Sequence, residues 1–405
     1  MMITILENPS ITSPLGFKSS AIRAGIYEHK YDLGLIVADQ PCNAAAVYTK
    51  NAVVADTIPI TRSNLQNGVA QGIIVNSGNA NACAINGTEN AKAVLEAISK
   101  ETGINSTDFI INSTGVVGVE LPKDKIISAI PSLVSKLSTE SSDDIAQAIM
   151  TTDTFSKSRA IQTEIGGKTI TIAAVAKGSG MIHPNMATML CFITTDLSIS
   201  SPMLQKALSH SVDKTYNRIT VDGDTSTNDM VAILASGLAK NEQITEESSD
   251  YHMFLEALNV VNLYLAQLIA RDGEGATHFV SVNVKNVNTE QEATQLAKSV
   301  AGSSLVKTAL FGSDANWGRV LVALGYSGVE FDKSKVSVEF SSIAGDIKVC
   351  SGGMGIAFDE SLAKSILKEK DIYINIDMGQ GEKFSYAFGC DLTYDYVKIN
   401  GDYRS

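Results

Sequence analysis

The chain has 405 residues, of which 44% are hydrophobic and 19% are charged, a balance typical of an ordered globular protein with two or three structural units. Its 32 Lys and Arg against 44 Asp and Glu give a net charge of −12 without any basic block, which argues against a nucleic-acid partner. No apolar run approaches the roughly 18 residues needed to span a bilayer, and the N-terminal sequence lacks the pattern of a secretory leader, so we expect a cytoplasmic protein outside the membrane.

The five cysteines are scattered and form no CxxC motif or Cys/His cluster, so the sequence predicts neither a disulfide framework nor a metal site. We expect all five to be small buried side chains: Cys42, Cys83, Cys191, Cys350 and Cys390. The flanking Leu190 and Phe192 place Cys191 in a buried strand rather than at a reactive thiol site.

Short apolar runs alternate with amphipathic segments, which predicts a mixed α/β fold. In the first half, the expected elements are strands at 34–38, 72–76 and 108–112 and helices at about 88–102, 122–137 and 142–150. A β-hairpin is expected over 158–176, because Gly166 and Gly167 can supply the positive φ of a tight turn. In the second half, the expected elements are a strand at 189–194, a helix that begins at Ser200, helices near 249–270, 289–300 and 360–369, and strands at 372–376, 384–388 and 396–399. No repeat or polar linker separates the halves, which we expect to interleave.

Two polar turns follow predicted strands, and the residues leave open whether they bind a ligand or only shape the fold. The sequence NSGNANA at 76–82 fits closely packed backbone groups or an ordinary turn capped by side chains. In NSTGVVG at 112–118, Gly115 would let a backbone N–H approach a ligand, so Thr114 and Gly115 are candidates for an oxyanion hole. The same STG sequence is common in plain strand-to-helix turns.

Charged residues mark three further segments. MTTDT at 150–154 ends a predicted helix and is typical of a cap for the next element. Lys177 is a lone cation among apolar residues and glycines, which suits either a substrate carboxylate or a solvated strand end. In RDGEGAT at 271–277, a helix end explains the glycines but not the acid, Glu274.

Thr188 follows a loop punctuated by glycine and proline, KGSGMIHPNMA at 177–187. A threonine hydroxyl inside a chain is a poor nucleophile. If the bond between Ala187 and Thr188 were cut, the new α-amine of Thr188 could act as the general base for its own hydroxyl. His183 is too close in sequence, across a proline, to complete a triad with Thr188. The Asp-rich run at 220–229 lacks the acid at the twelfth position of a calcium loop.

Together these motifs resemble the ornithine acetyltransferase family of arginine biosynthesis, over essentially the whole chain. The stretches that match its pattern, in order, are AGI at 24–26, 76–82, 113–118, 151–154, Lys177, Thr188, 222–229, 271–277, NWGR at 316–319 and NGDYRS at 400–405. Arg404 and Ser405 depart from the residues most common in the family, although Ser405 keeps a hydroxyl.

The resemblance implies an intertwined mixed α/β fold, of the type shared by ornithine acetyltransferases and β-aminopeptidases, in a self-cleaving N-terminal-nucleophile enzyme. It implies cleavage between Ala187 and Thr188 into an α chain of 1–187 and a β chain of 188–405, assembled as an αβ heterotetramer. Thr114 and Gly115 would form the oxyanion hole. The positions implied to contact substrate are Thr151, Lys177, Thr188, Glu274, Asn400 and Ser405.

The activity implied is glutamate N-acetyltransferase. Thr188 would attack the acetyl group of N2-acetyl-L-ornithine, and glutamate would take the acetyl from the threonine in a ping-pong reaction without a cofactor. Lys177 would suit an α-carboxylate and Glu274 an amino group. The sequence leaves open whether acetyl-CoA also serves as donor. Two other classes remain: an N-terminal-nucleophile aminopeptidase or amidohydrolase with the same nucleophile, and an uncleaved small-molecule-binding protein.

Overall fold

A computed structural model describes residues 2–140, 144–183 and 189–402. The chain divides into two compact units, and each is considered by itself. The first comprises Met1–Gly178, Pro184–Asn217 and Thr225–Leu265, and the second Ser179–His183, Arg218–Asp224 and Ala266–Ser405.

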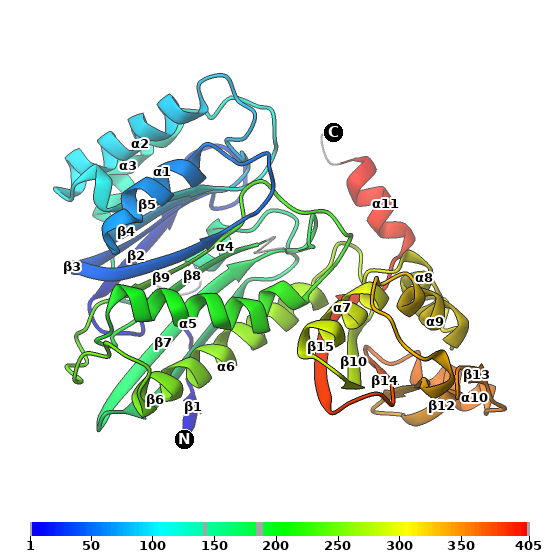
Figure 1. The fold of residues 1–405 in the computed structure, drawn as a ribbon. Coiled ribbons are helices and arrows are strands. Elements are labelled where there is room, and N and C mark those ends of the chain that lie inside the picture. Colours follow the sequence, from blue (N-terminus) through cyan, green and yellow to red (C-terminus); the bar gives the residue numbers. More distant parts are fainter. Residues whose placement is uncertain (1, 141–143, 184–188, 403–405) are drawn as a thin grey trace. The chain divides into compact units, whose positions relative to one another are not determined.

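The first unit is built on a mixed sheet that, in the described residues, has nine strands (Figure 1). Its order is β1-β6-β7-β8-β9-β3-β4-β5, and β2 pairs with β3. The strands are β1 (Ile3–Ile5), β2 (Phe17–Ile22), β3 (Leu33–Tyr48), β4 (Val69–Asn76), β5 (Phe109–Ser113), β6 (Lys157–Ile165), β7 (Lys168–Lys177), β8 (Leu190–Thr195) and β9 (Met230–Ala235). The helices are α1 (Thr57–Asn64), α2 (Gly87–Thr102), α3 (Lys123–Ser135), α4 (Asp144–Ala148), α5 (Ser201–Lys214) and most of α6 (Ser249–Arg271).

Strands from both sides of position 188 share this sheet. β7 pairs antiparallel with β8, with Lys177 opposite Leu190, and β9 pairs antiparallel with β3. The expected interleaving is therefore confirmed, and the fold is the intertwined mixed α/β arrangement. The hairpin predicted around Gly166 and Gly167 is also confirmed, since β6 and β7 pair along their whole length and both glycines have positive φ.

The sheet of the first unit is buried on both faces. In β4, Ile74 packs with residues of α2 and α3, whereas Ile73 packs into a separate cluster that includes Ile145 of α4 and Phe192 of β8. This two-sided burial explains why the central strands are continuous apolar runs instead of alternating ones. Cys191 is buried in β8, as predicted, and burial raises the pKa of its thiol to about 12.

Helix α6 corrects the expectation that no segment could span a bilayer. Among the described residues it is long and apolar enough by length and composition, with a mean hydropathy of 1.5 over an 18-residue window. Half of that window is buried in the fold. Phe254, Leu258 and Leu265 lie on its fully buried side, and α6 lies beside α5 (Figure 1), where Asn262 Nδ2 donates to Ser211 Oγ at 2.8 Å. This pattern is typical of a core helix.

The second unit has a sheet of order β13-β12-β11-β14-β10-β15 (Figure 1). The strands are β10 (Phe279–Val287), β11 (Ser337–Ser342), β12 (Gly345–Ser351), β13 (Met354–Gly355), β14 (Asp371–Asp377) and β15 (Lys383–Cys390). The helices are α7 (Glu290–Ala301), α8 (Ser304–Phe311), α9 (Trp317–Gly325), α10 (Glu360–Ile366) and α11 (Tyr394–Gly401). Residues of α7, α9 and α10 form one apolar core with the sheet, including Leu296, Val320 and Ile366.

Two expectations about local structure were wrong. Residues 396–399 belong to helix α11, not to a strand, because no described strand lies beside them to pair with and a helix satisfies its backbone groups internally. Cys83 is exposed, since it follows the tight turn at 76–82 with a φ of 56°, instead of being buried like the other four cysteines.

Candidate active site

The predicted site residues fall into two clusters, one in each unit. Thr114, Gly115, Thr151 and Lys177 belong to the first unit, and Glu274 and Asn400 belong to the second. Ala187, Thr188 and Ser405 lie outside the described residues.

Thr114 and Gly115 directly follow β5, at a place where two turns touch. The Thr114 N–H donates to Asn76 O at 2.9 Å, so this N–H is already engaged. The Thr114 hydroxyl accepts from Lys177 Nζ at 3.4 Å. No described residue accepts a hydrogen bond from the Gly115 N–H. The donors that remain for an oxyanion are therefore the Thr114 hydroxyl and the Gly115 N–H, rather than two backbone groups.

The backbone conformation and the close neighbours of position 115 permit only glycine there. Its φ is +133°, and a Cβ there would lie 2.4 Å from the carbonyl carbon of Gly78 and 2.5 Å from Asn79 N. The backbone of Gly78 and Asn79 therefore leaves no room for a side chain at this position.

The turn at 76–82 matches the structural alternative. Asn76 Nδ2 donates to Asn79 O at 3.0 Å, Ser113 Oγ donates to Asn76 Oδ1 at 2.7 Å, and Asn228 Nδ2 donates to Ala80 O at 2.6 Å. The asparagine side chains thus bond backbone groups inside the fold, as in Asx-stabilised turns. Their consequence for the site is indirect, since they hold the backbone against which Gly115 packs.

Lys177, the last residue of β7, is neither lone nor solvated. It is only 8% exposed. Its positive charge lowers the pKa of Asp153, of Asp229 and of Lys30, so all three side chains lie within its electrostatic reach. Lys177 is isolated in the sequence only because these residues are far away along the chain. Folding brings the ends of several elements of the first unit together.

Asp153 organises this cluster, and sequence analysis missed its role by treating 150–154 only as a cap. Its carboxylate accepts from Lys157 Nζ at 2.7 Å, from Gly178 N at 2.7 Å and from Thr151 N at 3.1 Å. Burial alone would raise the pKa of Asp153, but the charges of Lys157 and Lys177 and the Gly178 N–H outweigh it and lower the pKa to about 2. Asp153 therefore stays ionised and fixes the backbone beside Lys177.

Asp229 behaves in the opposite way. It is 2% exposed, and burial raises its pKa well above the usual range despite the charge of Lys177. The backbone N–H of Met189 donates a hydrogen bond to its carboxyl group. No described group forms a hydrogen bond with its Oδ2. Near the same lysine, the first unit therefore favours the charged form of Asp153 and disfavours the charged form of Asp229.

In the second unit, Glu274 and Asn400 meet. Asn400 Nδ2 of α11 donates to Glu274 Oε2 at 2.6 Å, and the Glu274 N–H donates to Ser179 O at 3.1 Å. Glu274 is 8% exposed. Its carboxylate lies directly against Gly180, where a Cβ would come 2.2 Å from Glu274 Oε1.

The segment Ser179–His183 is held in the second unit by Asp222, another residue that sequence analysis did not select. The N–H groups of Met181 and Ile182 donate to the Asp222 carboxylate at 2.6 and 2.8 Å. Asp222, from the Asp-rich run at 220–229, thus anchors this segment. No group of three or more His, Cys, Asp or Glu side chains that could hold a metal ion occurs among the described residues. His183 Nδ1 lies 2.9 Å from Thr220 Oγ1, and burial together with the charge of Lys298 lowers the pKa of His183 to about 4.

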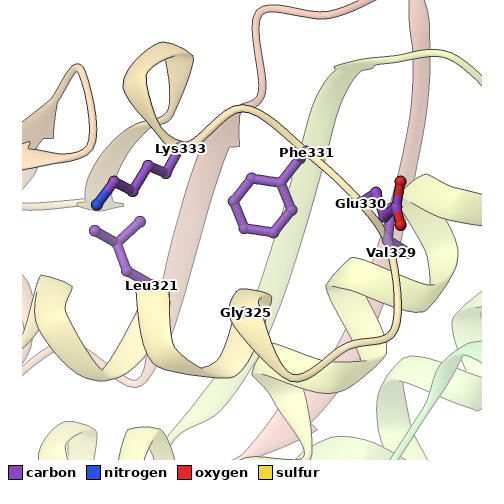
Figure 2. Close-up of a pocket in the computed structure, with 6 residues that line it drawn as sticks. All are labelled: Leu321, Gly325, Val329, Glu330, Phe331 and Lys333. Carbon is purple, nitrogen blue, oxygen red and sulfur yellow. The ribbon is translucent and has the colours of Figure 1, made fainter.

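A cavity of about 600 Å³ also opens in the second unit (Figure 2). Leu321 and Gly325 of α9 lie on one side, and Phe331 and Lys333 of the following segment lie on the other (Figure 2). None of the predicted site residues that the structure describes lines this cavity.

Comparisons with known proteins identify the family to which the chain belongs. The ArgJ family model matches residues 18–405. The arginine biosynthesis bifunctional protein ArgJ of Caldanaerobacter subterraneus is 49% identical over 396 residues, which cover 98% of each chain. The protein of that name from Symbiobacterium thermophilum is 48% identical over 399 residues, again covering 98% of each chain. A solved structure of ArgJ from Bacillus halodurans, 46% identical, covers 52% of this chain and 96% of its own, with a TM-score of 0.49.

The family predicted from the motifs is therefore confirmed, and with it the acyltransferase class. The chain belongs to the ArgJ family.

Proposed function

We propose that this chain is a glutamate N-acetyltransferase that transfers acetyl from N2-acetyl-L-ornithine to L-glutamate in arginine biosynthesis. Membership of the ArgJ family over residues 18–405 is the observation that carries this function. The relatives named above are called bifunctional proteins, so acetyl transfer from acetyl-CoA to glutamate is included in the proposal. Neither transfer requires a cofactor, because the acetyl group passes through a side chain of the enzyme.

The nucleophile in this proposal is Thr188, released by self-cleavage after Ala187. Cleavage gives an α chain of 1–187 and a β chain of 188–405, which assemble as a cytoplasmic αβ heterotetramer. The new α-amine takes the proton from the Thr188 hydroxyl as that oxygen attacks the acetyl carbonyl. Ornithine then leaves, the amine of glutamate attacks the acetyl-threonine ester, and acetylglutamate is released.

The oxyanion in both steps is stabilised by the Thr114 hydroxyl and the Gly115 N–H. Two features support this role. The N–H of Thr114 already donates to Asn76 O, so the hydroxyl is the donor that Thr114 can still offer. Lys177 Nζ donates to the oxygen of that hydroxyl, which leaves the hydroxyl proton for the oxyanion. A donor that is fixed before the reaction stabilises the developing charge without a reorganisation cost.

Recognition of the substrate is divided between charged groups. Lys177 and Thr151 bind the α-carboxylate that acetylornithine and glutamate share. Glu274, aligned by Asn400, receives the side-chain ammonium of ornithine, and Ser405 completes the contacts. The burial of Lys177 and Glu274 supports these roles, since partly desolvated charges interact more strongly with a ligand than solvated ones.

The test combines mass spectrometry with product analysis. Purified protein should contain a fragment that begins at Thr188, and it should convert acetylornithine and glutamate to ornithine and acetylglutamate. Thr188→Ala should remain uncleaved and inactive. Release of acetate without acetylglutamate would favour the hydrolase alternative, and an uncleaved, inert wild-type chain would favour the binding protein.

A further inference from the structure

Lys30 joins the charged cluster of the first unit from the loop between β2 and β3. Its Nζ donates to Thr151 O at 2.9 Å and to Met150 O at 3.2 Å. The same ammonium lies over the ring of Tyr27, 4.0 Å from its centroid. A residue more than a hundred positions away in sequence is thus held against the backbone of Thr151.

The position of Lys30 brings a second positive charge close to Lys177. Burial lowers the pKa of Lys30, the charges of Asp153 and Asp32 raise it, and the charge of Lys177 lowers it again. Two ammonium groups that repel each other in a half-buried place cost free energy in the free protein, and an anion bound near both would relieve that repulsion.

The acids near Lys30 already have other partners. Asp32 accepts the N–H groups of Ala24, Ile26 and Tyr27 at 2.5, 2.7 and 2.9 Å. Asp153 is occupied by Lys157 and by backbone N–H groups. Neither acid forms a salt bridge with Lys30 within the part of the chain that the structure describes.

Lys30 also has a donor left over. An ammonium group carries three N–H donors, and the described residues accept two of them, both through backbone carbonyls. The remaining N–H can be shared with a carboxylate, which forms strong charge-assisted hydrogen bonds with ammonium groups.

We propose that Lys30 is a substrate-binding residue, a second cation that acts with Lys177 on the α-carboxylate common to acetylornithine and glutamate. This inference rests on the proposed function. Its alternative is a purely structural lysine that ties the loop carrying Lys30 to residues 150 and 151.

Substrate truncation separates these roles. The variants are Lys30→Met, which keeps the length of the side chain without its charge, and Lys30→Arg. The matched control is Lys125→Met, because exposed Lys125 ties the same loop through Gly25 O at 2.8 Å. Each is assayed with acetylornithine and with N-acetylputrescine, which is acetylornithine without its carboxylate, and with glutamate and 4-aminobutyrate as acceptors.

We expect Lys30→Met to raise KM about tenfold for acetylornithine and for glutamate, with kcat changed less than about twofold. With N-acetylputrescine or 4-aminobutyrate, the variant and the wild type should have the same kcat/KM. Lys30→Arg should recover most of the loss, and Lys125→Met should match the wild type throughout.

An equal loss on intact and truncated substrates would overturn the proposal in favour of the structural role, as would wild-type KM values in Lys30→Met. Calorimetric titration with L-ornithine and with its methyl ester, which lacks the carboxylate charge, makes the same comparison without turnover: selective loss for ornithine supports the proposal, and equal loss refutes it. Failure of the proposed function would look different, because the wild type itself would then form no acetylglutamate.

Discussion

Gly180→Ala tests whether the position of the Glu274 carboxylate matters for the reaction. A methyl group at Gly180 would lie 2.2 Å from Cδ and Oε1 of Glu274 and 2.4 Å from Oε2. Contacts this short cannot exist, so the carboxylate must move away. Since it is the end of a flexible side chain, the fold should tolerate the change, with a Tm shift of less than about 3 °C.

The cost should appear in activity. Movement of Glu274 breaks its bond to Asn400 and displaces the charge that we propose receives the substrate ammonium. Hydrogen bonds to charged groups contribute about 1.5–3 kcal/mol, which corresponds to about a 10- to 150-fold loss of kcat/KM for acetylornithine. Steady-state rates, normalised to the cleaved fraction measured by mass spectrometry, give this number.

Two controls define the refutation. Gly325→Ala adds a methyl group in the same unit with no atom within 4 Å, and should leave the kinetics unchanged. In a Glu274→Gln background, Gly180→Ala should cause little further loss, because both changes disturb one interaction. A Gly180→Ala enzyme with wild-type kcat/KM, or fully additive losses in the double variant, would show that the reasoning about Glu274 is wrong.

Three further predictions concern the first unit. Gly115→Ala should lower kcat at least 100-fold and also lower Tm, since its Cβ meets the backbone of Gly78 at 2.4 Å and that backbone cannot rotate away; wild-type rates would contradict the packing. Thr114→Val should lower kcat about 100- to 1,000-fold while Thr114→Ser keeps most activity, whereas equal rates would exclude the hydroxyl as an oxyanion donor. Asp153→Asn should cost about 3–5 kcal/mol in the free energy of unfolding by urea, because Lys157 stays buried without its counter-charge; a loss below about 1 kcal/mol would refute this. The lowered pKa of Asp153 gives stability that is complete above pH 4 and is lost as the pH falls toward about 2, and Asp153→Asn should flatten that part of the acid-unfolding curve.

Local patterns in the sequence predicted much of the fold. The paired glycines at 166 and 167 correctly predicted the β6–β7 hairpin, and apolar periodicity correctly predicted α2 and α7. The error at 396–399 has a physical cause: Tyr396, Val397 and Ile399 favour strands, but strand formation needs a neighbour, and no described strand supplies one. Sequence patterns encode propensity, whereas strand pairing depends on the rest of the fold.

The site was harder to predict, because its charges interact across long separations in sequence. Lys177 looked isolated, yet Asp153 and Lys30 reach it from segments that are 24 and 147 residues earlier in the chain. Motif resemblance predicted residues that contact substrate, but it did not predict the residues that hold them in place. The importance of Gly180 follows only from its contact with Glu274 in the structure. That of Asp222 follows only from its hydrogen bonds to Met181 and Ile182.

Asp153 and Asp229, two buried acids whose pKa values are affected by Lys177, help to explain how this cluster can favour an anion. If Asp153 and Asp229 were both ionised, their charges would offset those of the nearby lysines. Burial raises the pKa of Asp229 well above its usual range and so disfavours its charged form, while Asp153 remains charged and accepts from Lys157 Nζ and the Gly178 N–H. The raised pKa of Asp229 and the pairing of Asp153 with Lys157 therefore both favour positive charge beside Thr151, where we expect a substrate carboxylate to bind.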